Sequence, residues 1–445
     1  MRILLIEDDA PLAAALMSFL ETRDFVCECA ASLAAARALA RKGHAVTLLE
    51  AGGHFGGHAN TVDVTLDGAT APVDTGFLVF NGKTYPNLIA LFDTLGVESV
   101  QTEMSFAVSL ENPDLEWAGS SLATVFGQKR NLLRPAFWTM LSDILRFNRE
   151  STAWLAVHPG DERPLGDFLK EGRYSDAFAD WYLLPMAAAI WSCPTAQMLA
   201  YPFHTFVRFC HNHGLLQITD RPTWMTVAGG SRTYVGMLAD AISARGSHVK
   251  SHCGALSIAR DSEGVSIKTI QGDLRFDQVV LACHSDQALA LLGDHATDEE
   301  RENLSKIRYQ PNRALLHSDA SLLPKRTKVW SAWNYASPGT SMSDGRNSPP
   351  VAVSYLLNRL QPLPTETPVI VSLNPWREPD HRYVYREINY AHPVFDGPAI
   401  NAQAAINSLS GQNRTYFAGA WLGYGFHEDG FASAVRAAGR LAPLP

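Results

Sequence analysis

The chain has 445 residues, of which 46% are hydrophobic, so it can bury a large core spread over two or three domains. Its formal net charge of −8 provides no clustered basic field, which excludes nucleic acid as an expected partner. The six cysteines are scattered and none stands at zinc-ligand spacing. We therefore expect no disulfide framework, no metal site and a reducing, cytoplasmic setting.

A membrane-spanning segment is not expected. Met1–Ile6 leads directly into the acids of residues 7–9, unlike a secretory leader, and no stretch is apolar over the ~20 residues that cross a bilayer. Any membrane contact is therefore expected at the bilayer surface. Residues 130–148 repeat apolar side chains at helical spacing, and we interpret them as an amphipathic helix packed on the core, with a membrane-surface helix as the alternative.

Short apolar runs alternate with helical patterns at the start of the chain and predict a parallel sheet. The expected strands are Arg2–Ile6, Phe25–Cys29 and Ala45–Glu50, and the expected helices are Pro11–Glu21 and Leu33–Lys42. Residues 100–220 are mostly helical in pattern. Strands return after residue 245, at Val249–His252, Ala255–Ala259, Val265–Thr269, Leu274–Phe276 and Val279–Cys283.

The last strand is expected at Thr415–Gly419, before a final helix from about Gly430 to Leu441. Sheet segments thus occur early, midway and at the end of the chain, which predicts one domain assembled from separated stretches. We expect an α/β protein, α+β overall, with a discontinuous Rossmann-like nucleotide-binding domain and an inserted domain of mixed sheet and helices. The first domain comprises residues 1–100, 221–290 and 405–445, and the inserted domain comprises residues 101–220 and 291–404.

Two motifs in the first domain suit a dinucleotide. An alanine-rich helix is followed by a strand that ends in Glu50, where a carboxylate can accept hydrogen bonds from a ribose diol. Gly56 and Gly57 then form a turn that can bring backbone N–H groups close to phosphate, and His58 follows. Residues 416–420 and 426–433 supply a closing strand, loop and helix, whose N-terminus can support negative charge.

These motifs resemble the amine-oxidase and phytoene-desaturase superfamily of flavoproteins over about residues 33–445. The resemblance implies FAD as cofactor and an oxidoreductase (dehydrogenase, desaturase or amine oxidase) that takes two electrons from a C–H bond of an apolar small molecule. A similar bacterial subgroup is associated with fatty-acid modification, which implies a fatty-acyl substrate. The cofactor-binding residues implied by the resemblance are Glu50, Gly56, Gly57, His58, Gly76, Phe77, Ala255, Gly419, Ala420, Glu428, Asp429 and Gly430.

Aromatic residues that follow the final strand are candidates for the substrate side of the flavin. Trp421, Tyr424 and His427 could line a channel there, and ordinary packing around a loop is the alternative. His211 and His213 stand two residues apart without a third ligand nearby, so we interpret them as structural residues and not as a metal site.

The glycine-rich loop that should follow the first strand is missing. A G-x-G-x-x-G turn would place glycines where Cys27, Cys29 and Ser32 stand. The first thirty residues resemble the start of a bacterial receiver domain, but Glu50 is not an ordinary phospho-acceptor, which disfavours a signalling role. Two explanations are open: a grafted amino terminus on a chain that has lost its own first strand, or Phe25–Cys29 acting as that strand.

The missing loop also defines a rival functional hypothesis. In it the chain is a non-catalytic pseudo-enzyme that has lost FAD and acts by binding a lipid or a partner. The sequence predicts neither the electron acceptor nor the oligomeric state.

Overall fold

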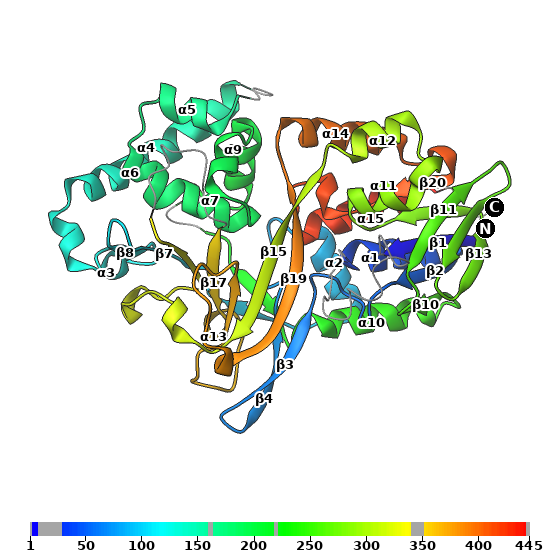
Figure 1. The fold of residues 1–445 in the computed structure, drawn as a ribbon, viewed down its shortest axis with the longest axis horizontal. Helices are drawn as coiled ribbons and strands as arrows, with labels where there is room; N and C mark the ends of the chain where they lie inside the picture. Colours follow the sequence, from blue (N-terminus) through cyan, green and yellow to red (C-terminus); the bar gives the residue numbers. More distant parts are fainter. Residues whose placement is uncertain (1, 8–28, 159–162, 218–220, 340–350, 442–445) are drawn as a thin grey trace.

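The computed structural model describes residues 2–7, 29–158, 163–217, 221–339 and 351–441. Figure 1 shows two lobes side by side, one built around a parallel sheet and the other around a mixed sheet. The long paired strands β15 (Arg308–His317) and β19 (Val384–Val394) lie between the lobes.

The first lobe is centred on a five-stranded sheet in which every pair of neighbours is parallel. Its strands are, in order across the sheet, β10 (His248–Lys250), β2 (Ala45–Glu50), β1 (Arg2–Glu7), β14 (Gln278–Leu281) and β20 (Thr415–Phe417). Successive side chains of a strand point to opposite faces. Val280 accordingly packs with helices α1 (Cys29–Arg41), α2 (Pro86–Leu95), α10 (Arg232–Ser243) and α15 (His427–Arg440). Val279 and Leu281 pack on the other face with α11 (Ser285–Leu292) and α14 (Gly397–Leu409).

The strand at the start of the chain holds the central place in this sheet. β1 pairs with β2 on one side and with β14 on the other, so the prediction at Arg2–Ile6 is confirmed. Of the alternative first strand Phe25–Cys29, only Cys29 lies within the described residues, where it begins helix α1 (Cys29–Arg41); among the described residues, β1 holds the place between β2 and β14. The expected helix at Pro11–Glu21 and the position of Cys27 lie outside the described residues.

The second lobe is centred on a seven-stranded sheet. Its strands are, in order, β19, β15, β18 (Ile370–Leu373), β17 (Ala352–Leu356), β16 (Trp333–Ser337), β7 (Phe106–Leu110) and β8 (Leu115–Ala118). All neighbours are antiparallel except β16 and β7. Three smaller sheets complete the fold: β3 (Thr61–Leu66) with β4 (Ala69–Asp74); β5 (Phe80–Asn81), β9 (Trp224–Val227) and β6 (Ser99–Thr102); and β11 (Ala255–Arg260), β12 (Val265–Thr269) and β13 (Gly272–Phe276).

Helices cover both sheets. Those of the second lobe are α3 (Leu122–Val125), α4 (Pro135–Val157), α5 (Leu165–Glu171), α6 (Asp176–Phe178), α7 (Leu184–Trp191), α8 (Thr195–Leu199), α9 (Phe203–Asn212) and α13 (Leu357–Leu360). The others are α2 (Pro86–Leu95), α10 (Arg232–Ser243), α11 (Ser285–Leu292), α12 (Asp298–Leu304), α14 (Gly397–Leu409) and α15 (His427–Arg440). Among the described helices, none combines the length and the apolar composition needed to cross a bilayer.

The predicted amphipathic helix at residues 130–148 is confirmed in kind and corrected at its start. A short 3-10 helix, η1 (Lys129–Leu133), comes first, and α4 begins only at Pro135, because proline suits the first turn of a helix and not its interior. Phe137 and Phe147 on α4 are fully buried, so this helix packs on the core as predicted. The predicted domain limits stay a prediction.

The buried carboxylate of Asp74, the last residue of β4, joins three stretches of chain. It accepts hydrogen bonds from the Ser231 backbone N–H at 2.9 Å and the Ser231 hydroxyl at 2.7 Å, just before α10. The Thr61 hydroxyl donates at 2.5 Å from β3. From the second lobe, the Gln361 side-chain N–H donates at 3.2 Å while its carbonyl accepts from the Asp74 backbone N–H at 2.9 Å.

We predict that Asp74→Asn lowers the free energy of unfolding by about 2–4 kcal/mol, because an amide in this place leaves buried donors unpaired. Asp63→Asn is the matched control, since Asp63 pairs with Arg232 at half-exposed positions and should cost less than about 1 kcal/mol. Urea unfolding of both variants measures the difference. Equal losses in the two variants would contradict the anchoring role of Asp74.

Candidate functional site

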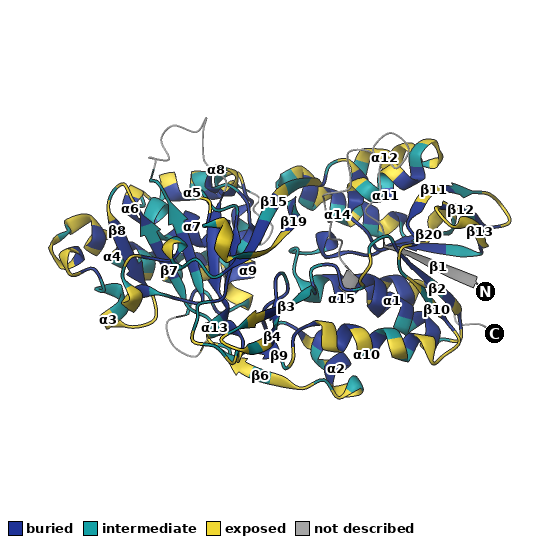
Figure 2. Cartoon of the chain, turned by 60° about the horizontal axis from the view of Figure 1, so that its bottom comes forward, coloured by how far each residue is buried: buried dark blue, intermediate teal, exposed yellow. Residues whose placement is uncertain are grey.

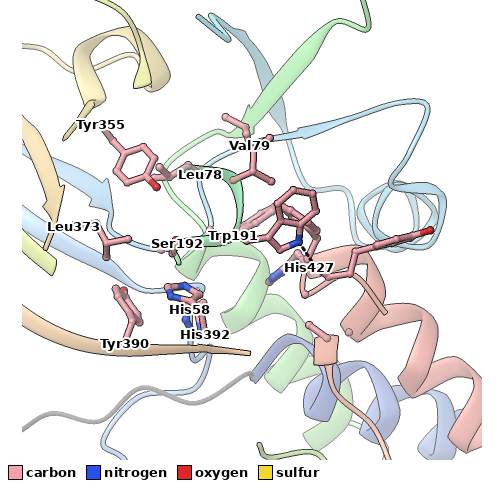
Figure 3. A pocket seen from close by; sticks show the side chains of 18 of the residues that line it. His58, Leu78, Val79, Trp191, Ser192, Tyr355, Leu373, Tyr390, His392 and His427 are labelled. Carbon is pink, nitrogen blue, oxygen red and sulfur yellow. Dashed lines mark hydrogen bonds between the residues drawn. The ribbon is translucent and has the colours of Figure 1, made fainter. Parts of the chain in front are cut away.

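A cavity of about 220 Å³ lies between the two lobes. Figure 3 shows the imidazoles of His58 and His392 beside one another on one side of it, and Tyr355 and Leu373 further up in the view. The first lobe contributes glycine turns and the start of α15, and the second lobe contributes apolar side chains from α7, α9 and the mixed sheet.

Residues 75–77, directly after the Asp74 anchor, form part of the cavity wall. The Thr75 hydroxyl lies 2.9 Å from the Asn60 carbonyl oxygen and 2.8 Å from the hydroxyl of Tyr390. Phe77 donates its backbone N–H to the carbonyl of His58 at 2.7 Å. A Cβ on Gly76 would stand only 2.4 Å from that same carbonyl oxygen, so only glycine fits between the two chain segments.

The imidazoles that line the cavity are neutral at pH 7. Burial lowers the pKa of His392 to about 4 and that of His427 to about 3, and it holds the pKa of His58 well below its usual range. Asn312 lies 2.7 Å from Nδ1 of His392, and Tyr234 lies 2.5 Å from Nε2 of His427. Within the described chain, no Asp, Glu, Lys or Arg lines the cavity.

Both ring nitrogens of His58 are buried without a hydrogen-bond partner among the described residues. The ring stacks on Tyr390 with centroids 4.6 Å apart, so it is fixed in place beside the cavity. A buried polar atom without a partner is costly. A bound molecule with hydrogen-bonding groups at this position would satisfy these nitrogens.

Two helix N-termini meet at one end of the cavity. Ala31, in the first turn of α1, and Gly430, in the first turn of α15, both line it and lie close to one another. Helix N-termini carry partial positive charge and free N–H groups, which favour anionic or electron-rich ligand atoms. The glycine turns, the unpartnered His58 and these N-termini together fit a flavin dinucleotide.

The structure places the predicted cofactor residues in three groups. Those that line the cavity are Gly56, His58, Gly76, Phe77, Ala420 and Gly430. Glu50 lies at the end of β2, where one carboxylate oxygen accepts the Gly52 N–H at 2.6 Å, and its own carbonyl accepts the Cys253 N–H at 2.8 Å. This second contact brings Glu50 next to the segment that leads into Ala255, the first residue of β11.

The remaining predicted residues do not line this cavity, and their role in cofactor binding stays a prediction. Gly57 has a positive φ of 52° in the glycine turn, and the backbone N–H of Gly419 donates to the Ser433 hydroxyl at 2.8 Å. The carboxylate of Glu428 accepts the N–H groups of residues 87 and 88 at the start of α2, at 2.9 and 3.0 Å. Asp429 accepts the Phe426 N–H at 2.9 Å at the start of its own helix. Neither acid lines the cavity.

Of the three aromatic candidates, Tyr424 and His427 line the cavity and Trp421 does not. The prediction for Trp421 is wrong because the 3-10 turn Ala420–Leu422 directs its side chain into the core behind the parallel sheet. It is fully buried there and donates its indole N–H to the Cys283 carbonyl at 3.0 Å.

Sequence reasoning missed most of the cavity wall that the second lobe supplies. Trp191 comes from the end of α7, and Tyr390 and His392 come from β19, far from it in the sequence. No local pattern in the sequence indicates that these residues meet. His213 also lines the cavity, and burial lowers its pKa to about 4. The described residues contain no cluster of His, Cys, Asp or Glu able to hold a metal.

Comparison with known proteins agrees with this architecture. The fold is similar to that of a cyclohexylamine oxidase from Brevibacterium oxydans IH-35A, with a TM-score of 0.66 and 16% identity over 98% of this chain and 97% of that one. A CLA-producing fatty acid isomerase from P. acnes gives a TM-score of 0.65 and 15% identity over 99% of this chain and 98% of that one. Putrescine oxidase bound to putrescine gives a TM-score of 0.63 and 14% identity over 99% of this chain and 98% of that one. No curated protein matches the chain by sequence.

The parallel sheet, the glycine turns and the cavity between two lobes define a flavin-dependent oxidoreductase, with FAD as its cofactor. The model of the flavin containing amine oxidoreductases matches residues 33–442, and the chain belongs to that family. The predicted superfamily, fold class and cofactor are thereby confirmed. Nothing in these findings favours the rival hypothesis of a pseudo-enzyme.

We predict that Gly76→Ala weakens FAD binding by about tenfold or more, because the added Cβ must displace the backbone at His58. Gly82→Ala is the matched control, since a Cβ there meets no atom within 4 Å. Quenching of FAD fluorescence in a titration measures both affinities. Equal affinities in the two variants would show that residues 56–58 and 76 do not form the FAD-binding site.

A second prediction concerns Asp429, which burial gives a pKa of about 7. Its folded-state pKa lies above its unfolded value, so the native state binds more protons and the parent loses stability as pH rises from about 4 to about 7. Asp429→Asn lacks this dependence and should gain thermal stability relative to the parent between pH 5 and pH 8. Thermal unfolding at both pH values, with exposed Asp93→Asn as control, tests this. A constant difference between parent and variant would refute it.

Proposed function

We propose that this oxidoreductase removes hydrogen from a C–H bond in the uncharged hydrocarbon part of a substrate of the fatty-acyl type. The observation that carries the proposal is the wall supplied by the second lobe, where Met104, Ile190, Trp333, Val371 and Leu373 face the cavity. Such side chains recognise a hydrocarbon chain by excluding water. One of the similar folds belongs to a protein named as a fatty acid isomerase, which agrees with this substrate class.

The same wall disfavours a cationic amine as substrate. An ammonium group that leaves water needs a carboxylate or several strong acceptors. The described lining contains no carboxylate, and its histidines are neutral at pH 7 because burial lowers their pKa values. A chain without charge at its reacting end meets no such penalty.

The residues of the chain orient the substrate and keep water out. Two-electron acceptance is the chemistry that FAD supplies when bound. Phe77 stacks on His427 with centroids 3.9 Å apart, which fixes this imidazole at the start of α15. The N-terminus of α15 directs its N–H groups toward the same end of the cavity and favours negative charge there. No charged side chain of the described lining is positioned as a general base.

A cation stands where the wall meets solvent. Tyr424 lines the cavity, and its hydroxyl accepts a hydrogen bond from Nε of Arg208 at 2.6 Å. Arg208 is exposed on α9, so it can also reach an anionic group outside the cavity. A fatty acid offers this pattern, since its carboxylate would pair with Arg208 while its chain lies inside.

The test is anaerobic mixing of the FAD-loaded protein with fatty acids, fatty-acyl esters and alkyl amines of equal chain length, followed through flavin absorbance. Fatty-acyl compounds should bleach the flavin and amines should not. Arg208→Gln should raise the concentration of fatty acid that gives half-maximal bleaching by roughly tenfold, because it removes one charge-assisted hydrogen bond. Arg382→Gln, on an exposed arginine that pairs with Asp380, should leave it unchanged. Bleaching by amines alone would refute the proposal.

A further inference from the structure

One end of the second lobe presents apolar side chains to solvent. We call residues 121–138 the apolar tip; they comprise α3, η1 and the start of α4. Leu122 is 79% exposed and Leu133 is 87% exposed, with Leu132 and Trp138 about half exposed. These four are among the eleven exposed large apolar side chains of the described chain, so they are concentrated here. Figure 2 shows α3 and α4 at the end of the molecule away from the parallel sheet.

The local structure of the tip inverts the usual pattern of burial. Within η1 and the residue before it, Gln128 and Asn131 are buried while the leucines point outward. Gln128 accepts the Glu116 backbone N–H at 2.9 Å, and Asn131 donates to the Glu116 carbonyl at 3.1 Å. Because Gln128 and Asn131 occupy the buried positions of this turn, Leu132 and Leu133 project into solvent. A cluster of exposed leucines of this kind marks a surface that interacts with an apolar partner.

Trp138 occupies the edge of this surface in a fixed position. Its indole N–H donates to the Leu132 carbonyl at 3.0 Å, and its ring packs on Phe126 with centroids 5.3 Å apart. An indole with one apolar side and one polar contact is typical of the boundary between water and a lipid bilayer.

The charged residues within the tip are all cationic, and the acids beside it are paired: Asp114 with Arg130 and Glu116 with Arg326. Between Glu116 and Asp143 the sequence contains Lys129, Arg130 and Arg134 and no acidic residue. The neighbouring turn η5 (Thr327–Val329) adds exposed Lys328, since Val329 packs against Gly127. The whole chain carries a net charge of −8, so this positive cluster is a local exception. Arg130 pairs with Asp114, whereas Lys129 and Lys328 make no ion pair with described residues.

We propose that the apolar tip docks on the surface of an anionic phospholipid bilayer. Leucines and a tryptophan enter the interfacial layer while the surrounding cations contact lipid phosphates. Complementary charge favours this occupant over a second copy of the chain, because two positive tips repel one another. The proposal rests on this surface alone and does not depend on the flavin or on the identity of the substrate.

Co-sedimentation of the full chain with vesicles tests the proposal. The parent should sediment with vesicles of equal parts phosphatidylglycerol and phosphatidylcholine, and far less with phosphatidylcholine alone. Leu133→Asp should lower the partition coefficient by about tenfold or more, since an anion replaces a leucine that enters the bilayer when the protein binds. Ile270→Asp is the matched control: Ile270 is 60% exposed on the turn between β12 and β13, and its variant should bind as the parent does.

The charge component is tested with Lys129→Glu combined with Lys328→Glu, which should weaken binding several-fold, while added salt should weaken the parent likewise. Unchanged secondary structure and melting temperature in each variant show that the fold is intact. The proposal would be overturned if Leu133→Asp bound vesicles as well as the parent does, or if the parent did not bind anionic vesicles. A parent dimer that Leu133→Asp dissociates would assign the tip to a second copy instead and also overturn it.

Discussion

The buried carboxylate of Asp74 gathers donors from β3, from the turn before α10 and from Gln361 in the other lobe. Burial raises the pKa of this carboxyl group, and a buried polar group is stable only while its hydrogen bonds are complete, so these three stretches must keep their relative positions. The residues that follow inherit this constraint. Gly76 is pressed against the carbonyl of His58, and Phe77 is stacked on His427, which positions two of the histidines that line the cavity.

A second feature of the site is that the described lining of the cavity contains no Asp, Glu, Lys or Arg. Burial lowers the pKa values of His392 and His427 far enough that both rings are neutral at physiological pH. Polarity in the cavity therefore comes from oriented N–H groups, ring nitrogens and hydroxyls. Such groups offer little to a cation, which is the physical basis of the apolar, fatty-acyl substrate proposed above.

The sequence was sufficient for elements that local pattern defines. The apolar strand Ala45–Glu50, the hairpins after residue 255 and the final helix follow from periodicity and turn residues. It was insufficient for contacts between distant residues. Asp74 meets Ser231 across 157 positions, and no local signal announces that pairing. Trp421 was placed on the wrong side because the direction of a side chain in a 3-10 turn depends on the core it meets.

The amino terminus shows what local sequence pattern predicts and what it does not predict. The strand at Arg2–Glu7 was predictable from its apolar residues, and it completes the parallel sheet between β2 and β14. Ser32, where the usual motif has its third glycine, lies fully buried in the first turns of α1. The family match from residue 33 implies FAD as the cofactor, although no glycine precedes Gly43 in the sequence.

The visible absorption spectrum of the purified chain, before and after addition of FAD, shows whether this site binds a flavin. We expect a flavin band near about 450 nm that reaches one FAD per chain and remains with the protein through gel filtration. A colourless protein that takes up no FAD at high concentration would contradict this expectation.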